Sequence, residues 1–195
     1  MKKLTTASII HLVLLGLLSI SNIVVMVIFV INLGSVDPGK EKAEVILNII
    51  STLTILAMIA MGIVYSLNNY EKRAAKYYKA FLLLNVVVTI MTVLIGIIFS
   101  KLDLLTIFKS VVYGTKALLL LALALWKDLG ESKTWILYCA IWFLDITVFM
   151  LIVIKMAMTS FDISFMGILT ALVSDVVMGI AIRGKYLDKE SRGTK

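Results

Sequence analysis

Six long apolar stretches, separated by short polar segments, constrain this chain more than any other feature. They cover residues 9–33, 45–67, 81–99, 104–126, 134–154 and 161–182. Each is close to the about 20 residues that an α-helix needs to cross the hydrocarbon core of a bilayer. Because lipid offers the backbone no hydrogen-bond partners, stretches of this length are stable in a membrane as helices. The sequence therefore predicts an all-α, polytopic transmembrane helical bundle with six spans.

The composition agrees with a membrane protein. Hydrophobic residues make up 61% of the chain and charged residues 16%, whereas soluble domains are typically about 45–50% apolar and about 25% charged. The segments between the stretches are too short for a separate soluble domain, so we expect residues 1–195 to form a single integral membrane domain. The first stretch is longer than the about 7–15 residues of a signal-peptide core. We therefore interpret it as a retained span.

The distribution of Lys and Arg predicts the orientation of the bundle. With six spans, one side receives both termini and segments 68–80 and 127–133, which together hold most of the basic residues. The other side receives only Lys40, Lys42, Lys101 and Lys155. The positive-inside rule then predicts that both termini are cytoplasmic. The net charge of +7 is thus interpreted as a topology signal rather than a nucleic-acid-binding surface, and it favours a prokaryotic plasma membrane.

The sequence gives no support to an enzyme or to a cofactor. It contains no Walker-type loop, no HExxH, no GxSxG and no paired-cysteine motif. Cys139 and His11 are the only residues of their types. An intramolecular disulfide and a thiolate cluster are therefore excluded, and a histidine-based metal site or catalytic relay would depend on one side chain. We predict no catalytic site, no metal and no cofactor.

Four charged side chains interrupt the last three apolar stretches. They are Lys109, Lys116, Asp145 and Asp175. A charge at the centre of a spanning helix costs about 2.5–3.5 kcal/mol on insertion scales, so such residues seldom face lipid. Lys116 and Asp145 lie next to the midpoints of their stretches, and Asp175 lies just cytoplasmic of its own. At about 1.5 Å of rise per residue the three differ in depth by about one helical turn, so we expect them to meet in the interior.

Neighbouring residues extend this predicted site. Tyr113 lies between the two lysines in an i, i+4, i+7 row along one helix face. Asp175 belongs to a stripe that recurs every four residues with Gly167, Ala171 and Gly179, and small residues let helices approach closely. Aromatic side chains, Trp142 among them, share a helix face with Asp145. The predicted substrate- or ion-binding residues are Lys109, Tyr113, Lys116, Trp142, Asp145 and Asp175.

The first three stretches carry no charged residue in their cores, but they do carry rows of polar side chains. Asn85 and Thr89 are examples in the third stretch. We interpret these rows as interhelical hydrogen bonds. The alternative is that Asn85 and Thr89 complete the wall of the charged site.

Two functions fit these observations. In the first, the charged groups line a polar cavity near the bilayer midplane and bind a small solute or a proton. The protein is then a small-solute transporter or a membrane-embedded substrate-binding subunit. In the second, Lys116 forms a buried ion pair with Asp145 or Asp175 that only fixes helix packing, and the protein is a scaffold, immunity or assembly subunit. The expected partners are the lipid bilayer, a small-molecule or proton ligand and a protein at the cytoplasmic face, with no nucleic acid.

Overall fold

The computed structural model describes residues 4–99, 103–126, 129–158 and 172–184, and the side chains of 155–158 are not described. Its helices are α1 (Thr6–Ser35), α2 (Lys40–Leu67), the short 3-10 helix η1 (Lys72–Ala74), α3 (Ala75–Phe99), α4 (Leu104–Leu125) and α5 (Glu131–Met158). Residues 172–184 form a further helix. The part of the chain that is described contains no strand, which confirms the all-α prediction.

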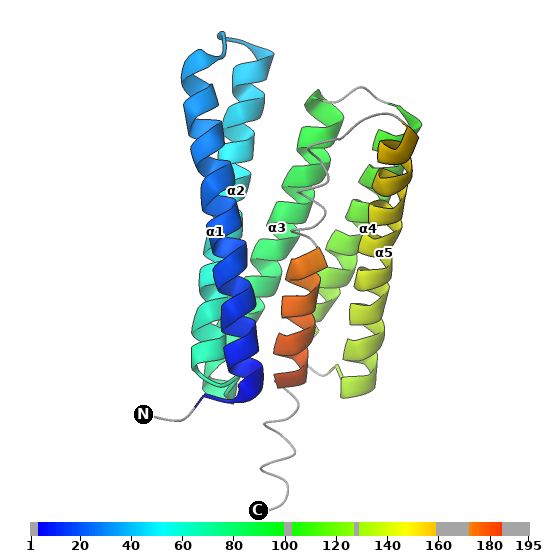
Figure 1. The fold of residues 1–195 in the computed structure, drawn as a ribbon. Coiled ribbons are helices and arrows are strands. Elements are labelled where there is room, and N and C mark those ends of the chain that lie inside the picture. Colours follow the sequence, from blue (N-terminus) through cyan, green and yellow to red (C-terminus); the bar gives the residue numbers. More distant parts are fainter. Residues whose placement is uncertain (1–3, 100–102, 127–128, 159–171, 185–195) are drawn as a thin grey trace, which may run out of the picture.

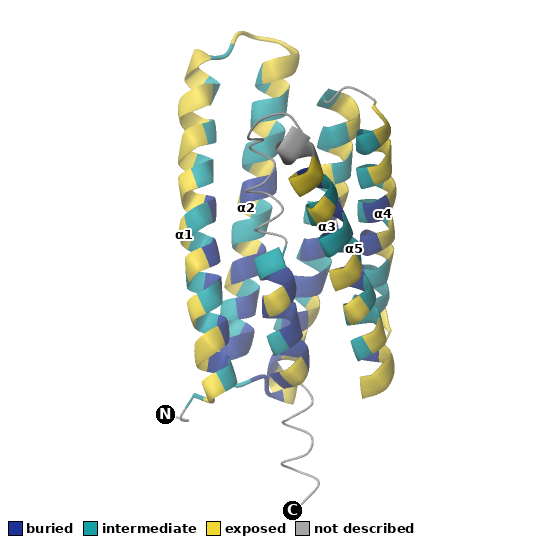
Figure 2. Cartoon of the chain, turned by 45° about the vertical axis from the view of Figure 1, so that its right-hand side comes forward, coloured by how far each residue is buried: buried dark blue, intermediate teal, exposed yellow. Residues whose placement is uncertain are grey.

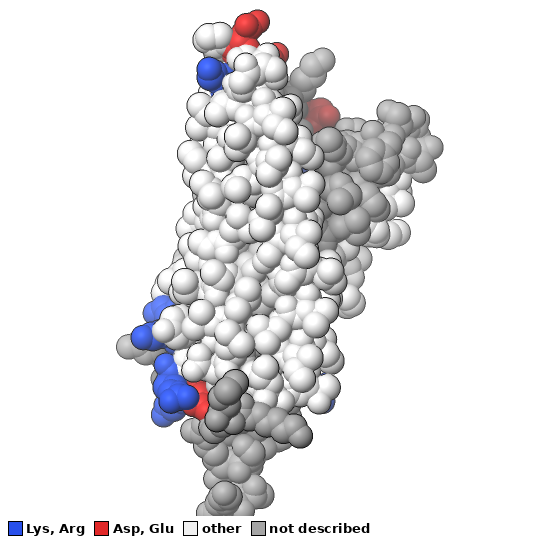
Figure 3. Space-filling model, turned by 60° about the vertical axis from the view of Figure 1, so that its left-hand side comes forward, with Lys and Arg blue, Asp and Glu red and all other residues white. Residues whose placement is uncertain are grey.

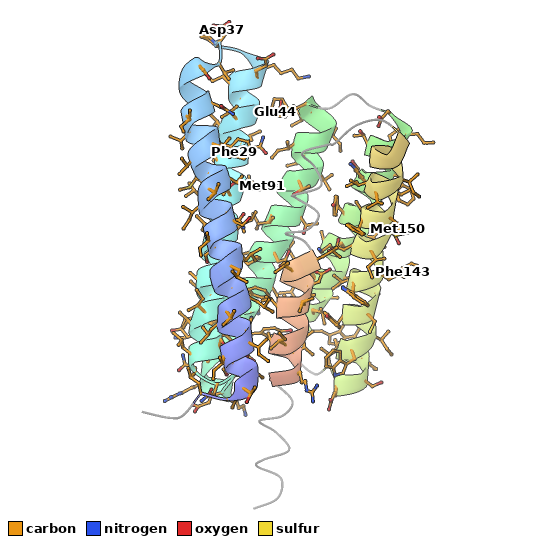
Figure 4. The ribbon with its side chains drawn as sticks, viewed as in Figure 1. Phe29, Asp37, Glu44, Met91, Phe143 and Met150 are labelled. Atoms are coloured by element: carbon orange, nitrogen blue, oxygen red, sulfur yellow. The ribbon has the colours of Figure 1, made fainter. Side chains whose placement is uncertain are left out.

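Five of these helices are long enough and apolar enough to cross a membrane, so this is an integral membrane protein. The most apolar window of each is only 17–28% buried. Large apolar side chains instead point away from the bundle, as Phe143 and Met150 of α5 do in Figure 4. Lipid therefore solvates most of the apolar surface. The sixth predicted span, 161–182, lies outside the described residues except for its helical part from 172 onward.

Consecutive helices pack as antiparallel neighbours (Figure 1). The contacts between α1 and α2, between α2 and α3, and between α3 and α4 are extensive, and those between α4 and α5 are fewer. The start of α1, the end of α2 and the end of helix 172–184 all lie at one end of the bundle, which we call the N-side. The α1–α2 connection, with Asp37 at its tip (Figure 4), lies at the opposite end.

The larger hydrophobic cluster occupies the half of the bundle nearest the N-side (Figure 2), and a smaller one, of Val112, Val148 and Ile152, lies between α4 and α5 toward the opposite end. Helix 172–184 contributes Val177, Met178, Ala181 and Ile182 to the larger cluster. They share one cluster with Leu15 of α1, Tyr65 of α2, Phe81 of α3, Leu120 of α4 and Ile141 of α5. All six helices therefore meet in the N-side half, because helix 172–184 packs among the other five there.

Local sequence signals explain where several helices begin. The Thr5 side chain accepts a hydrogen bond from the Ser8 backbone N–H (3.2 Å) at the start of α1. The Asp103 carboxylate accepts one from the Thr106 N–H (2.7 Å) at the start of α4. Both are N-cap interactions. Before α2 the chain turns through Gly39, whose φ of 148° favours glycine. Helices α1, α2 and α3 begin before the apolar stretches that predicted them, because polar residues at a span's end also continue the helix.

Charged side chains gather at the two ends of the bundle, as the face in Figure 3 shows. The exposed basic residues of the N-side include Lys72, Arg73, Lys76 and Lys79. The opposite end carries Asp37 and Glu41 beside Lys40 and Lys42. An uncharged band separates the two groups on this face, as a membrane-spanning segment requires. Which end faces the cytoplasm stays a prediction.

Most hydroxyl side chains within the spans bond to their own helix rather than to a neighbouring one. Thr89 donates to the Asn85 carbonyl (2.8 Å), Thr92 to the Val88 carbonyl (3.0 Å) and Thr52 to the Asn48 carbonyl (2.8 Å). Each of these three hydroxyl groups therefore donates within its own helix, and the interpretation of the polar rows as interhelical hydrogen bonds stays a prediction. A carbonyl one turn earlier is the nearest acceptor for a hydroxyl in lipid, and it needs no partner helix.

Candidate functional site

Helices α4, α5 and 172–184 bring Lys116, Asp145 and Asp175 together in the bundle interior. Lys116 Nζ donates a hydrogen bond to Asp145 Oδ2, and it lies 3.5 Å from Asp175 Oδ1. The side chain of Lys116 is 4% exposed, and those of both aspartates are 0% exposed. We call these three residues the charged trio. Whether the trio binds a ligand stays a prediction.

The pattern of buried residues on each helix explains why these side chains face inward. On α4, Lys116 belongs to a buried stripe with Val112 and Leu120, spaced by four residues. On α5, Asp145 lies between the buried residues Ile141 and Val148. Residues three and four apart share one face of a helix, so the apolar members of each stripe fix the rotation of the helix. The charged member is thereby turned into the core.

The remaining predicted site residues lie at different distances from the trio. Tyr113 is half-buried one turn from Lys116 and interacts electrostatically with both aspartates. Lys109 is half-buried one further turn along α4. Trp142 is 43% exposed and lines a groove on the outer surface. Of the small-residue stripe, Gly179 packs against Tyr138, whereas Gly167 and Ala171 lie outside the described residues.

The charges of the trio do not balance. Two carboxylates and one ammonium leave an excess of one negative charge in the interior. Among the described residues, Asp145 Oδ1 and Asp175 Oδ2 have no hydrogen-bond donor, and Asp175 Oδ1 has only the 3.5 Å ion pair with Lys116. The side-chain nitrogen of the buried Asn85 and the hydroxyl of Ser174 also lack a partner there. Buried polar atoms are nearly always satisfied, if not by protein then by water or a ligand. A bound water, proton or cation would supply the partners that these atoms lack.

A metal cluster is not the obvious occupant. Within the described ranges, no three His, Cys, Asp or Glu side chains gather in a way that could hold a metal ion. Two carboxylates beside an ammonium differ from both the oxygen cages of Ca²⁺ and the Cys and His sets of Zn²⁺. The arrangement is better suited to a proton or to a small monovalent cation.

A second buried polar cluster, at the N-side, was not predicted from the sequence. His11 of α1 is 1% exposed, and its Nδ1 lies 3.1 Å from the Tyr70 hydroxyl, with the two rings stacked. Ser66 donates to the Ser8 carbonyl (3.0 Å) and lies 3.4 Å from the same hydroxyl. His11 and Tyr70 are 59 residues apart in the chain, so His11 looks isolated in the sequence. The one indication of this cluster in the sequence was that Ser8 and His11, three residues apart, share a face of α1.

The backbone after α2 holds this cluster in place. Asn69 and Tyr70 have positive φ values of 49° and 60°, a conformation that Asn tolerates better than Tyr does. The Asn69 side-chain oxygen accepts hydrogen bonds from the Thr5 N–H (3.2 Å) and from the Ser8 hydroxyl (3.0 Å). Burial raises the pKa of the Tyr70 hydroxyl above its ordinary value. The phenol thus keeps its proton and joins the start of α1 to the α2–α3 connection.

Replacing Tyr70 with Phe should destabilise the protein by about 1 kcal/mol, the usual net contribution of a hydrogen bond that is lost. The midpoint of thermal unfolding in detergent would measure this. Tyr77→Phe is the matched control, because Tyr77 is half-buried and lies outside the cluster. Equal effects of the two substitutions would show that the Tyr70 hydroxyl contributes no specific contact.

Comparison with known proteins does not assign this chain to a family. No protein-family model matches this chain, no curated protein is significantly similar to it, and no solved structure matches it.

Proposed function

We propose that this protein is a small-solute membrane transporter or a membrane-embedded solute-binding subunit, and that the charged trio is its binding site. The ligand carries one positive charge and is either a proton or a small cation. The excess carboxylate of the trio is the observation that supports this proposal. A second acid would be costly to retain in the interior if nothing neutralised it.

The depth of the trio also supports a transport site. Lys116 is the thirteenth of the 22 residues of α4, and Asp145 is the fifteenth of the 28 residues of α5. Both are therefore near the middle of helices that are long enough to span a membrane. Substrate and ion sites of transporters lie near the bilayer midplane, where access from either side can alternate around one fixed site. Ionisable groups at this depth are functional candidates for the same reason.

A non-transporting scaffold is the second candidate, and one observation favours it. The Lys116–Asp145 pair is buried and directly hydrogen-bonded, which is what a pair that only fixes helix packing requires. The two candidates differ in the role of Asp175. In a scaffold Asp175 is a second structural partner of Lys116, whereas in a transporter it accepts the ligand.

We also propose that the N-side faces the cytoplasm of a prokaryotic cell. The basic residues of η1 and of the first turns of α3 support this orientation, because cytoplasmic segments near spans are enriched in Lys and Arg. A cytoplasmic protein partner would then meet this same basic end. Accessibility of a cysteine introduced at the exposed Lys79 in a Cys139→Ser background, measured in intact cells and in lysed cells, tests the orientation.

Ligand-induced stabilisation tests the proposed site. The detergent-purified protein is heated with Na⁺, K⁺, guanidinium or choline and at a series of pH values. A ligand at 100 times its dissociation constant stabilises the folded state by about 2.7 kcal/mol. We expect one cation, or a fall in pH if the ligand is a proton, to raise the melting temperature of the wild type. Asp175→Asn should abolish that response.

The control removes an acid outside the bundle. Asp37→Asn makes the same chemical change at an exposed position in the α1–α2 connection, and it should leave the response intact. If no cation or pH change stabilises the wild type relative to Asp175→Asn, the binding proposal is refuted in favour of the scaffold. Flux of the stabilising cation into proteoliposomes, present in the wild type and lost in Asp175→Asn, would then distinguish a transporter from a binding subunit.

A further inference from the structure

An apolar groove of about 370 Å³ lies on the outer surface between α5 and helix 172–184. Trp135, Tyr138 and Trp142 line it from α5. Val176, Gly179 and Arg183 line it from the other helix. Trp142 and Val176 are 43% and 44% exposed, so the groove opens outward, where lipid surrounds the spans. None of these residues belongs to the charged trio.

The groove runs inward from the N-side. The two helices are antiparallel, with α5 leaving the N-side and helix 172–184 returning to it (Figure 1). Trp135 and Arg183 mark its N-side end, and Trp142 and Val176 lie seven residues deeper on their respective helices. At about 1.5 Å per residue the groove extends for about 10 Å. This is the direction in which an acyl chain extends from a headgroup.

The two ends of the groove differ in chemistry. Its walls are apolar and aromatic, and among the described residues that line it the charged one is Arg183, at the N-side end. The Arg183 side chain is exposed, and no carboxylate of the described residues lies within ion-pair distance of it. Trp135 packs edge-on against Tyr138 at the same end. Arg with aromatic residues at a membrane boundary is suited to a lipid headgroup.

Gly179 allows close packing between the two helices that form the groove. A side chain there would collide with Tyr138, whose Cζ is 2.7 Å from the position that a Cβ would occupy. The absence of a side chain at Gly179 therefore makes room for Tyr138. Both residues line the groove, so this close contact forms part of its wall.

We propose that this groove is a binding site for one anionic phospholipid of the leaflet on the N-side. The phosphate pairs with the Arg183 guanidinium, which donates in a geometry suited to phosphate oxygens. One acyl chain lies along Trp142 and Val176. A cation that lines the groove at the headgroup end distinguishes it from an ordinary lipid-facing surface, because Arg183 selects by headgroup charge.

Fluorescence quenching by brominated lipids tests the selection. The variant Trp126→Phe with Trp135→Phe keeps Trp142 as its only tryptophan, and Phe at position 135 keeps an aromatic ring at the headgroup end in every protein compared. It is reconstituted into phosphatidylcholine vesicles that contain a minor fraction of phosphatidylglycerol. In one sample the phosphatidylglycerol is brominated on its acyl chains, and in the other an equal amount of the phosphatidylcholine is brominated instead. At this equal mole fraction of brominated lipid, brominated phosphatidylglycerol should quench Trp142 more strongly. Arg183→Gln should lower this preference by about fivefold, the change in affinity that corresponds to about 1 kcal/mol.

Two controls make the result decisive. Lys79→Gln removes the same charge from an exposed N-side position on α3, and it should leave the preference intact. Arg183→Lys keeps the charge and should retain most of the preference. Equal quenching by both lipids in the wild type would overturn the proposal. So would an equal loss in Lys79→Gln and Arg183→Gln, because the basic end as a whole would then attract the lipid.

Discussion

Replacing Lys116 with Met should destabilise the folded protein by about 3–5 kcal/mol, because removal of one partner leaves the other charges buried without compensation. Lys116 pairs with both Asp145 and Asp175, and both carboxylates are fully buried. Without it the two negative charges would face each other in the core. Chemical unfolding in detergent, followed by circular dichroism, gives the change in free energy of unfolding.

Two further variants test the cause of this effect. Lys79→Met makes the same change at an exposed position and should have little effect. Lys116→Met combined with Asp145→Asn and Asp175→Asn removes all three charges and should recover most of the lost stability, because a neutral core no longer contains an uncompensated charge. A triple variant as unstable as the single one would show that the shape of the Lys116 side chain, rather than its charge, holds the helices together.

Replacing Gly179 with Leu should destabilise the protein by about 3 kcal/mol, at the upper end of the usual cost of overpacking. Tyr138 of α5 occupies the space that the new side chain would need. Helix 172–184 would have to move away from α5, and the contact between Lys116 and Asp175 would be lost with it. The same unfolding experiment measures the change in free energy.

Removing the Tyr138 ring should recover part of the stability that Gly179→Leu loses. Tyr138→Ala combined with Gly179→Leu is expected to be more stable than Gly179→Leu alone, a coupling that a double-mutant cycle measures directly. Gly16→Leu is the matched control, since a Cβ at Gly16 meets nothing within 4 Å and Leu has a higher helix propensity than Gly. If Gly16→Leu is as destabilising as Gly179→Leu, the close packing of Gly179 on Tyr138 does not explain the loss of stability.

The part of this protein that could be predicted from its sequence is the part that depends on distance along one helix. The length of each apolar stretch set the five confirmed spans, because a bilayer fixes how many apolar residues a helix needs. The depth of a residue follows from the same count. Lys116, Asp145 and Asp175 could therefore be expected at similar depths before any contact between them was known.

Only the tertiary structure decided how each helix is rotated and which neighbours it meets. The sequence did not determine that Lys116 donates to Asp145 and lies 3.5 Å from Asp175. It placed Trp142 beside Asp145, whereas the packing of α5 turns Trp142 outward into the groove. The contact of His11 with Tyr70 joins residues 59 positions apart. Depth is a property of one helix and can be counted, but rotation and pairing are settled by the side chains of several helices packing at once.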